Sequence, residues 1–432
     1  MPRLEGWGRH PGHDAQVSTP AHIDAIRPLL AQGQTLARGM GRSYGDSALA
    51  DHVISMRQWD RFIAFDPEQG ILTCEAGVTL DDILRVMVPQ GWFLSVTPGT
   101  RYVSVGGAIA SDVHGKNHHR DGCFSHYLLD MDVLCGDGEI RTCSTHTHAD
   151  LFHATCGGMG LTGIILRARL RLRPIRSAWM REITLRARTL DEALELFERY
   201  ADATYSVAWI DCLARGTGLG RSLVMLGEHA EFGTRRAAVD SRLSNPCSLP
   251  GSLLNTQTIR AFNALYFRRV PKDVQERQVH YAPYFYPLDG IQHWNRLYGR
   301  RGFLQYQCVL PRASAREGLT QLLSLIAESG RGSFLAVLKA MGPANANLLS
   351  FPLDGYTLAL DFRYDRALPS LFHTLDCCVR DHAGRLYLTK DAHMSPALFR
   401  AGYPAWEQFQ EIRARYGALG RFESLQSRRL GL

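Results

Sequence analysis

The most informative stretch of the chain is Thr97-Pro-Gly-Thr-Arg-Tyr-Val-Ser-Val-Gly-Gly-Ala-Ile-Ala-Ser-Asp-Val-His-Gly-Lys-Asn-His-His119. Gly106 and Gly107 lack side chains, so their N–H groups can approach a pyrophosphate closely, and Ser104 and Ser111 add short hydroxyls. A tight turn with a seam of small packed residues would use the same residues. The stretch alone therefore leaves both a phosphate-binding role and a packing role open.

A second glycine-rich stretch, Ala37-Arg-Gly-Met-Gly-Arg-Ser-Tyr-Gly-Asp46, favours the ligand-binding interpretation. Two such loops can form a cradle, in which one holds phosphate oxygens and the other supports the rest of a dinucleotide. Arg38 or Arg42 could pair with the phosphate charge. Neither stretch fits the strand-GxGxxG-helix pattern or GxxxxGK[ST]. A Rossmann domain and a P-loop ATPase are therefore disfavoured.

With these loops, the motif Asp150-Leu-Phe-His-Ala-Thr-Cys-Gly-Gly-Met-Gly-Leu-Thr-Gly-Ile-Ile165 resembles the vanillyl-alcohol-oxidase type of FAD-binding fold. Within it, the chain is similar over nearly its whole length to decaprenylphosphoryl-β-D-ribose 2'-oxidases. The motifs that carry this resemblance are Arg38 to Asp46, His114-Gly-Lys-Asn-His-His119, Trp294-Asn-Arg, Gly302-Phe-Leu-Gln-Tyr-Gln307 and Gly384-Arg-Leu-Tyr-Leu-Thr-Lys-Asp391.

The resemblance implies an α+β fold in three segments. Residues 1–178 would form a PCMH-type FAD-binding domain, and residues 179–384 a substrate domain built on an antiparallel sheet flanked by helices. Residues 385–432 would return to the first domain.

Periodicity predicts the main elements directly. The spacing predicts a helix over 79–87 after a Thr cap, and an amphipathic helix over 190–200. Leu166-Arg-Ala-Arg-Leu-Arg-Leu-Arg173 alternates with period two, which predicts a strand whose arginines either face water or hold acidic partners. Further strands are predicted at 53–56, 71–75, 131–134, 205–211, 303–310, 333–339 and 356–362.

Composition excludes several classes of function. A net charge of +7 without basic blocks or interleaved aromatics gives no support for nucleic-acid binding. The 10 cysteines lack CxxC spacing, so we expect most to be reduced and buried. No secretory signal and no apolar run of ~18 residues is present, which predicts a cytoplasmic protein, with export by another route left open.

The resemblance also implies which residues bind the cofactor and perform the chemistry. Tyr44, His114 and Lys390 would lie around the isoalloxazine and the sugar as catalytic residues, with His114 or Lys390 handling the proton. Arg42 stands where relatives of the wider fold carry a flavin-linked histidine, which implies noncovalent FAD. The expected cofactor-binding residues are Arg38, Gly39, Met40, Gly41, Arg42, Ser43, Tyr44, Gly45, Asp46, Gly99, Ser104, Val105, Gly106, Gly107, Ser111, His114, Ile165 and Tyr387.

The expected substrate pocket lies on the second domain. Gln305 and Gln307 alternate along a strand and so share a face, although polar groups satisfied within a sheet would show the same spacing. The expected substrate-binding residues are Trp209, Gln305, Gln307, Lys339, Ala359 and Asp361, where Trp209 could equally be core. Ala359 replaces a pocket cysteine of the mycobacterial enzymes.

Two of these motifs have simpler explanations. His114, His118 and His119 lie close together in sequence, but no Cys or carboxylate completes a ligand set, so we expect no metal. Lys390 and Asp391 could form an ordinary exposed ion pair.

The function implied is FAD-dependent oxidation of the 2'-hydroxyl of a polyprenylphosphoryl-β-D-ribofuranose to the 2'-keto sugar. A separate short-chain NAD(P)H-dependent reductase would then complete an epimerisation to the arabinose form, used for cell-wall arabinan. The alternatives are a soluble sugar, alditol or aldonolactone oxidase, and a flavin-free binding or scaffold protein.

The stretch from Leu249 to Lys272 could bring the protein to the inner face of a membrane. Ile259, Phe262, Leu265 and Tyr266 are expected on one helical face beside basic residues, which suits contact with anionic lipid. A core helix with a basic exposed side is the alternative.

Overall fold

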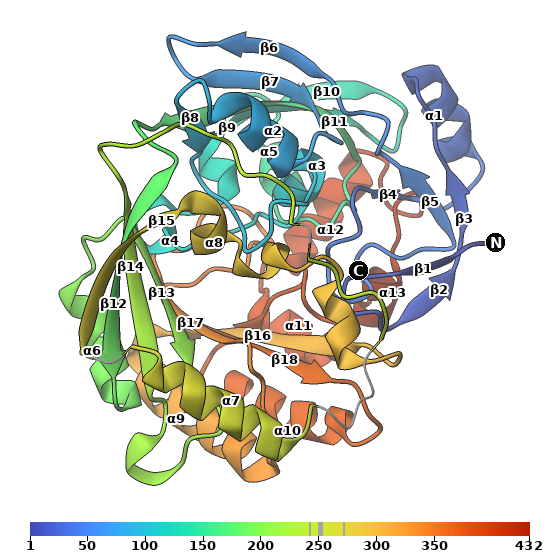
Figure 1. Ribbon diagram of the computed structural model, residues 1–432. Coiled ribbons are helices and arrows are strands. Elements are labelled where there is room, and N and C mark those ends of the chain that lie inside the picture. The colour runs from blue at the N-terminus through green and yellow to red at the C-terminus, as the bar shows by residue number, and fades with distance from the viewer. Residues whose placement is uncertain (242, 249–253, 271–272) are drawn as a thin grey trace.

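An N-terminal six-stranded sheet and a later eight-stranded sheet organise the chain (Figure 1). The computed structural model describes residues 1–432 except 242, 249–253 and 271–272. Both sheets are antiparallel and are packed against helices, which confirms the predicted α+β class.

The N-terminal part of the chain contains three sheets. A hairpin of β1 (Arg3–Glu5) and β2 (Gly12–Asp14) precedes a small parallel sheet of β3 (Gln16–Ser18), β5 (His52–Ser55) and β4 (Leu36–Arg38), with α1 (Ile23–Ala31) between β3 and β4. The six-stranded sheet contains β6 (Phe62–Asp66), β7 (Ile71–Glu75), β8 (Trp92–Leu94), β9 (Leu128–Leu134), β10 (Ile140–Cys143) and β11 (Ile164–Pro174). The associated helices are α2 (Leu80–Met87), α3 (Val105–Ala110), α4 (His118–Asp121) and α5 (Ala149–Thr155).

The structure confirms two of the elements predicted for the N-terminal part of the chain and shows why each forms. Helix α2 begins after Thr79, whose hydroxyl accepts from the Asp82 N–H while the Asp82 carboxylate accepts from the Thr79 N–H. Strand β11 keeps its apolar residues buried and its arginines toward water. Both expectations for these arginines hold, because Arg167 is partly exposed and also pairs with Asp132 of β9 at 2.7 Å.

The eight-stranded sheet has the order β15-β12-β14-β13-β17-β18-β16-β19. Its strands are β12 (Trp179–Ala187), β13 (Tyr205–Ile210), β14 (Ser222–His229), β15 (Val274–His280), β16 (Phe303–Pro311), β17 (Ala336–Met341), β18 (Gly355–Arg363) and β19 (Arg385–Leu386). Helices α6 (Leu190–Arg199), α9 (Arg312–Ser329) and α10 (Leu368–Asp381) pack on one face of it. Two more helices are α7 (Thr256–Arg268) and α8 (Tyr281–Phe285).

Successive side chains of β16 point to opposite faces of the sheet, one face covered by helices and the other free of them. Tyr306 points to the helical layer, with its ring 5.1 Å from that of Phe372 in α10. Its neighbours Gln305 and Gln307 therefore face the opposite side, which is not covered by these helices.

The C-terminal segment returns to the N-terminal part of the chain. It contains α11 (Pro396–Gly402), α12 (Trp406–Arg415) and α13 (Leu425–Leu430). Arg429 of α13 binds Asp46 at 2.9 Å, and the Leu425 N–H donates to the Leu49 carbonyl at 2.8 Å. The segment thereby holds the loop after β4 in place.

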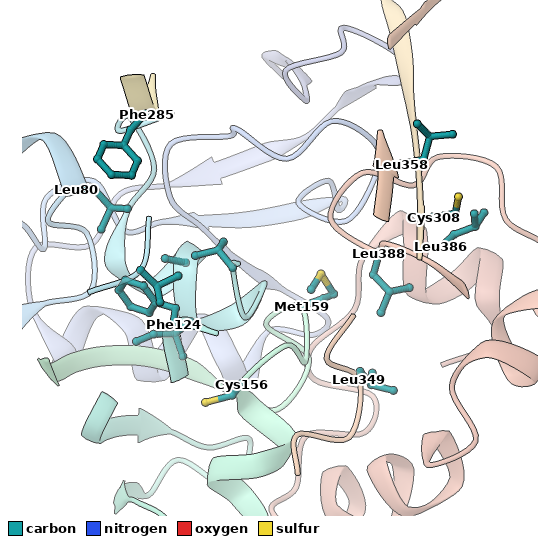
Figure 2. Close-up of a cluster of buried hydrophobic side chains, with 14 of the residues drawn as sticks. Leu80, Phe124, Cys156, Met159, Phe285, Cys308, Leu349, Leu358, Leu386 and Leu388 are labelled. Carbon is teal, nitrogen blue, oxygen red and sulfur yellow. The ribbon is translucent and has the colours of Figure 1, made fainter. Parts of the chain in front are cut away.

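A continuous buried core joins the two sheets. Figure 2 shows Leu80 and Phe124 from the N-terminal part, Leu358 and Leu386 from the eight-stranded sheet, and Met159 between these groups. Because apolar packing is continuous across the two parts, loops from one can be held against side chains from the other.

Candidate functional site

A cavity of about 810 Å³ lies between the loops of the N-terminal part and the free face of the eight-stranded sheet. Most of the expected cofactor-binding residues line it: Arg38, Gly39, Met40, Gly41, Arg42, Ser43, Tyr44, Gly99, Ser104, Gly106, Gly107, Ser111, His114, Ile165 and Tyr387. All of the expected substrate-binding residues, and Lys390, line it as well.

Three expected cofactor residues lie behind the cavity wall. Asp46 is ion-paired with Arg429, and Val105 is fully buried in the core. A Cβ on Gly45 would lie 1.8 Å from the Asp391 carbonyl oxygen, so this glycine allows two backbones to touch. These three residues support the loops without lining the cavity.

The loop after β4 has the character of an anion-binding nest. Within the described chain, the N–H groups of Met40, Gly41, Arg42 and Ser43 donate to no protein acceptor. Gly41 has φ +62°, which turns the backbone so that successive N–H groups converge. A Cβ on Gly39 would lie 2.1 Å from Ser104 Oγ, so the two glycine-rich loops are in contact.

The second glycine pair does not offer the free N–H groups expected from the sequence. The Gly106 N–H donates to the Ala76 carbonyl at 2.7 Å, and the Gly107 N–H donates to Ser104 Oγ at 3.3 Å. These bonds form because Ser104 caps α3 and the loop packs on β7. The packing explanation is therefore correct for these two N–H groups, and the exposed donors belong to Met40–Ser43.

The two arginines of the first loop differ in what they bind. Arg38 donates to the carbonyls of Ala48 and Glu5, each at 2.7 Å, and so its guanidinium is used internally. Arg42 stacks on the Trp7 ring, 4.1 Å from its centre, and forms no hydrogen bond or ion pair with any residue that the structure describes. Arg42 is therefore the arginine available to a ligand.

The floor of the cavity comes from four neighbouring strands. Gln305 and Gln307 (β16) pair across the sheet with Asp361 and Ala359 (β18), while Lys339 lies on β17 and Trp209 on β13. Gln305 Nε2 donates to Asp361 Oδ1 at 2.6 Å. Trp209 is both wall and core, because its indole N–H donates to the Phe334 carbonyl at 3.1 Å and its ring packs on Tyr266.

The hydrogen-bond network fixes the protonation of His114. Thr357 donates its hydroxyl to the Cys308 carbonyl at 2.8 Å, so it can only accept from Gln307 Nε2 at 3.3 Å. The Gln307 amide nitrogen therefore faces His114 and donates to its Nε2 at 3.2 Å. This arrangement assigns the proton of the neutral ring to Nδ1, which is buried and has no hydrogen-bond partner among the described residues. Burial, with Lys339 nearby, holds the pKa of His114 well below its usual range.

Lys390, Tyr44 and Asp361 form a group with altered acidity. The Lys390 ammonium lies 3.8 Å from the centre of the Tyr44 ring. Burial lowers the pKa of Lys390, while the charge of Asp361 raises it in part. Burial raises the pKa of Asp361 and of the Tyr44 hydroxyl. Burial thus lowers the pKa of Lys390 and raises that of Asp361, each to about 7, so both members of this pair can exchange a proton near neutral pH, whereas Tyr44 keeps its proton.

Lys390 and Asp391 are not an exposed ion pair. Asp391 is 1% exposed in its side chain and binds Arg429 at 2.8 Å, whereas the Lys390 ammonium lies on the Tyr44 ring. The histidines beside His114 also have structural partners. His118 Nδ1 accepts from the Gly342 N–H at 3.0 Å, and His119 Nε2 lies 2.9 Å from the Ala203 carbonyl.

Several cavity residues were not predicted from the sequence. They include Trp7, Lys116, Glu182, Arg277, Tyr284 and Asp289. Lys116 lies inside the motif 114–119, so that motif was the available signal, whereas nothing local marks Glu182 or Arg277. Among the described residues, the charged groups that line the cavity are seven cations (Arg38, Arg42, Lys116, Arg269, Arg277, Lys339, Lys390) and three carboxylates (Glu182, Asp289, Asp361).

Helix α7 departs from the face expected for it. Ile259 is buried and Tyr266 packs on Trp209 with ring centres 4.6 Å apart, whereas Phe262 is 41% and Leu265 73% exposed. These positions therefore divide between the inside and the outside of the molecule. Leu249 and Lys272, the ends of the expected stretch, lie outside the described residues.

The described residues contain neither a metal-ligand cluster nor a membrane-spanning helix. No three His, Cys, Asp or Glu side chains are grouped as metal ligands would be. No described helix has the length and apolar composition needed to cross a membrane.

Comparison with known proteins agrees with this geometry. The family model described as an FAD binding domain matches residues 15–144. Over 100% of its length the chain is 34% identical to the decaprenylphosphoryl-β-D-ribose oxidase of Mycolicibacterium smegmatis, of which it covers 97%.

More distant similarities cover parts of the chain. An uncharacterised protein of Streptomyces coelicolor is 33% identical over 82% of this chain and 100% of its own length. Cytokinin dehydrogenase 2 of Arabidopsis thaliana is 31% identical over 40% of this chain and 36% of its own. The full-length match, together with the FAD binding domain, shows that this chain is an FAD-dependent oxidoreductase of the decaprenylphosphoryl-β-D-ribose oxidase family.

Proposed function

We propose that this protein oxidises the 2'-hydroxyl of a polyprenylphosphoryl-β-D-ribofuranose to a ketone. The observation that carries the proposal is one continuous cavity that joins the Met40–Ser43 nest to the polar floor around Lys390. Alcohol oxidation requires an acceptor for a hydride and an acceptor for a proton. The cavity has room for a hydride-accepting cofactor beside the nest and offers a proton acceptor on its floor.

The residues of the N-terminal loops fit FAD. The unpartnered N–H groups of Met40–Ser43 would hold the pyrophosphate, and Arg42 would balance its charge. When bound, FAD supplies the hydride acceptor. A guanidinium at position 42 offers no imidazole for a flavin bond, so binding is noncovalent.

Lys390 is the proposed base. A neutral lysine can accept the proton of the sugar hydroxyl, and burial favours the neutral form of Lys390. His114 is a poorer candidate, because the lone pair of its Nε2 is already occupied by the Gln307 amide. His114 and Gln307 would instead orient the sugar ring, and Tyr44, whose pKa is raised, would keep its hydroxyl proton.

The lipid part of the substrate would lie along α7. Trp209, Tyr266 and Phe262 line the cavity, and Phe262 also reaches the surface beside the exposed Leu265. We propose that this edge makes peripheral contact with the inner face of the membrane that holds the substrate, from the cytoplasm. A separate short-chain NAD(P)H-dependent reductase would consume the keto product.

Anaerobic flavin reduction tests the proposal. Purified holoenzyme is mixed with farnesylphosphoryl ribose, with free pentoses and with alditols, and the flavin absorbance is followed. Bleaching by the phosphoryl ribose alone is the expected result. Bleaching by free sugars or alditols instead would favour a soluble sugar, alditol or aldonolactone oxidase. Protein that binds no FAD would favour a scaffold role.

A further inference from the structure

Lysine is rare in this chain and is concentrated in one place. The sequence contains four lysines, at positions 116, 272, 339 and 390, among 49 Lys and Arg residues in total. Three of the four line the cavity, and Lys272 lies outside the described residues. Every lysine that the structure describes therefore lies at this cavity, together with four arginines, whereas the other described cations are arginines.

The three cavity lysines have different surroundings. Lys390 lies on Tyr44 beside Asp361, and Lys116 donates to the Tyr284 carbonyl and lies on the Tyr284 ring. Lys339 has no hydrogen-bond acceptor, carboxylate or aromatic ring as a partner in the part of the chain that the structure describes. Burial lowers the pKa of Lys339 to about 8, because an ammonium that is removed from water and has no anion beside it is destabilised.

The position of Lys339 on the sheet connects it to the reacting sugar. Lys339 pairs across the strands with Thr357, and Thr357 accepts from Gln307, which binds His114. Lys339 and Lys390 line the same cavity, and the Lys339 charge lowers the pKa of Lys390. Lys339 is therefore adjacent to the proposed site of oxidation.

Strand β17 also marks a change in the character of the cavity floor. On one side, β18 and β16 present Asp361, Gln305 and Gln307. On the other side, β13 and β14 next to it present the apolar Trp209 and Met225, and the Arg277–Glu182 ion pair of β15 and β12 lies beyond them. A molecule with a sugar on the polar side and a prenyl chain on the apolar side would have its phosphate over β17.

We infer that Lys339 binds the phosphodiester of the substrate and so selects lipid-phosphate-linked sugars over free sugars. The inference rests on the proposed function. In such a substrate the phosphate is attached to the carbon next to the one oxidised, a few covalent bonds from it, so its cation must lie beside the reaction centre. Lys116 lines the same cavity and would add positive charge to this anion site.

Ligand binding to the holoenzyme tests this inference separately from turnover. Farnesyl phosphate and farnesol are titrated into the wild type, Lys339→Met and Lys339→Arg, and binding is followed by flavin fluorescence. We expect Lys339→Met to weaken farnesyl phosphate binding by roughly tenfold or more, with farnesol within about twofold and with Lys339→Arg near the wild type. Equal losses for both ligands, or no loss, would overturn the inference.

Amine labelling gives a second readout. Because the chain has four lysines, peptide mass analysis after acetylation resolves each one. Farnesyl phosphate should protect Lys339 and farnesol should not; equal protection by both would contradict an anion site. Wild-type flavin that bleaches with free pentoses but not with farnesylphosphoryl ribose would refute the proposed function instead, whatever the binding data.

Discussion

The Lys390 ammonium packs on the face of the Tyr44 ring, 3.8 Å from its centre, and thereby joins the C-terminal segment to the loop after β4. The contact joins residues far apart in the chain, and it exists because the Tyr44 N–H donates to the Thr389 carbonyl at 3.1 Å. This backbone bond holds Lys390, the proposed base, against the loop whose N–H groups at Met40–Ser43 have no protein acceptor among the described residues.

Removing the Lys390 amine should strongly slow flavin reduction without loss of flavin. We expect Lys390→Met to slow anaerobic reduction by about 100- to 10,000-fold, because a positioned base is lost. His114→Gln should retain much more activity, since the role proposed for His114 is orientation. Stopped-flow absorbance measures both rates, and bound FAD is measured in the same samples. Comparable rates in Lys390→Met and wild type would remove Lys390 as the base.

The pH dependence of reduction should report the charge around Lys390. The base is active when deprotonated, so the rate rises with pH through the Lys390 pKa, which burial places below the ordinary lysine value. Asp361 raises this pKa and Lys339 lowers it. Asp361→Asn should therefore move the rising limb to lower pH, and Lys339→Met should move it to higher pH. Shifts in the same direction would contradict the assignment of this limb to Lys390.

Arg42 should hold the flavin by charge and not by a covalent bond. Acid precipitation of the holoenzyme should release all FAD, which mass analysis of tryptic peptides can verify. Arg42→Ala should weaken FAD binding by about tenfold, because a charge-assisted contact is lost. Arg300→Ala provides a control at an exposed position outside the cavity. A flavin adduct on any peptide would disprove the noncovalent assignment.

The sequence was sufficient for elements whose pattern is local. The Thr79 cap, the alternation in 166–173 and the shared face of Gln305 and Gln307 all follow from spacing within a few residues. The sequence was not sufficient where the hydrogen-bond partner of a residue comes from a distant segment of the chain. The Gly106 N–H is taken by Ala76, a bond that no local pattern encodes.

The same limit applied to the site residues. Glu182 and Arg277 join the cavity only through the pairing of β12 with β15. The altered acidity of Lys390 likewise depends on a fold that buries it near Asp361. Residue types near the motifs could be predicted, whereas their hydrogen-bond partners and protonation could not.

Membrane contact through α7 should depend on its exposed apolar residues. Phe262→Ser with Leu265→Ser should reduce binding to anionic liposomes and slow turnover of a long-chain substrate, because buried apolar area is lost at the lipid surface. A short-chain analogue should be oxidised at nearly the wild-type rate. Ile63→Ser, which alters a 51% exposed residue on β6, is the control. If the double variant loses activity equally on the long-chain substrate and on the short-chain analogue, then α7 contributes to folding or to the pocket and not to membrane contact.

The methyl group of Ala359 should make the protein insensitive to inhibitors that bond to a cysteine at this position. Ala359 lies between Gln307 and Val337 on the cavity floor, and its side chain offers no thiolate. Ala359→Cys should therefore produce time-dependent inactivation and a mass increase on the peptide that carries residue 359. The exposed Cys247 can react in either protein, so the adduct must be located by peptide. An Ala359→Cys variant that turns over normally yet never reacts would show that position 359 is not accessible from the substrate pocket.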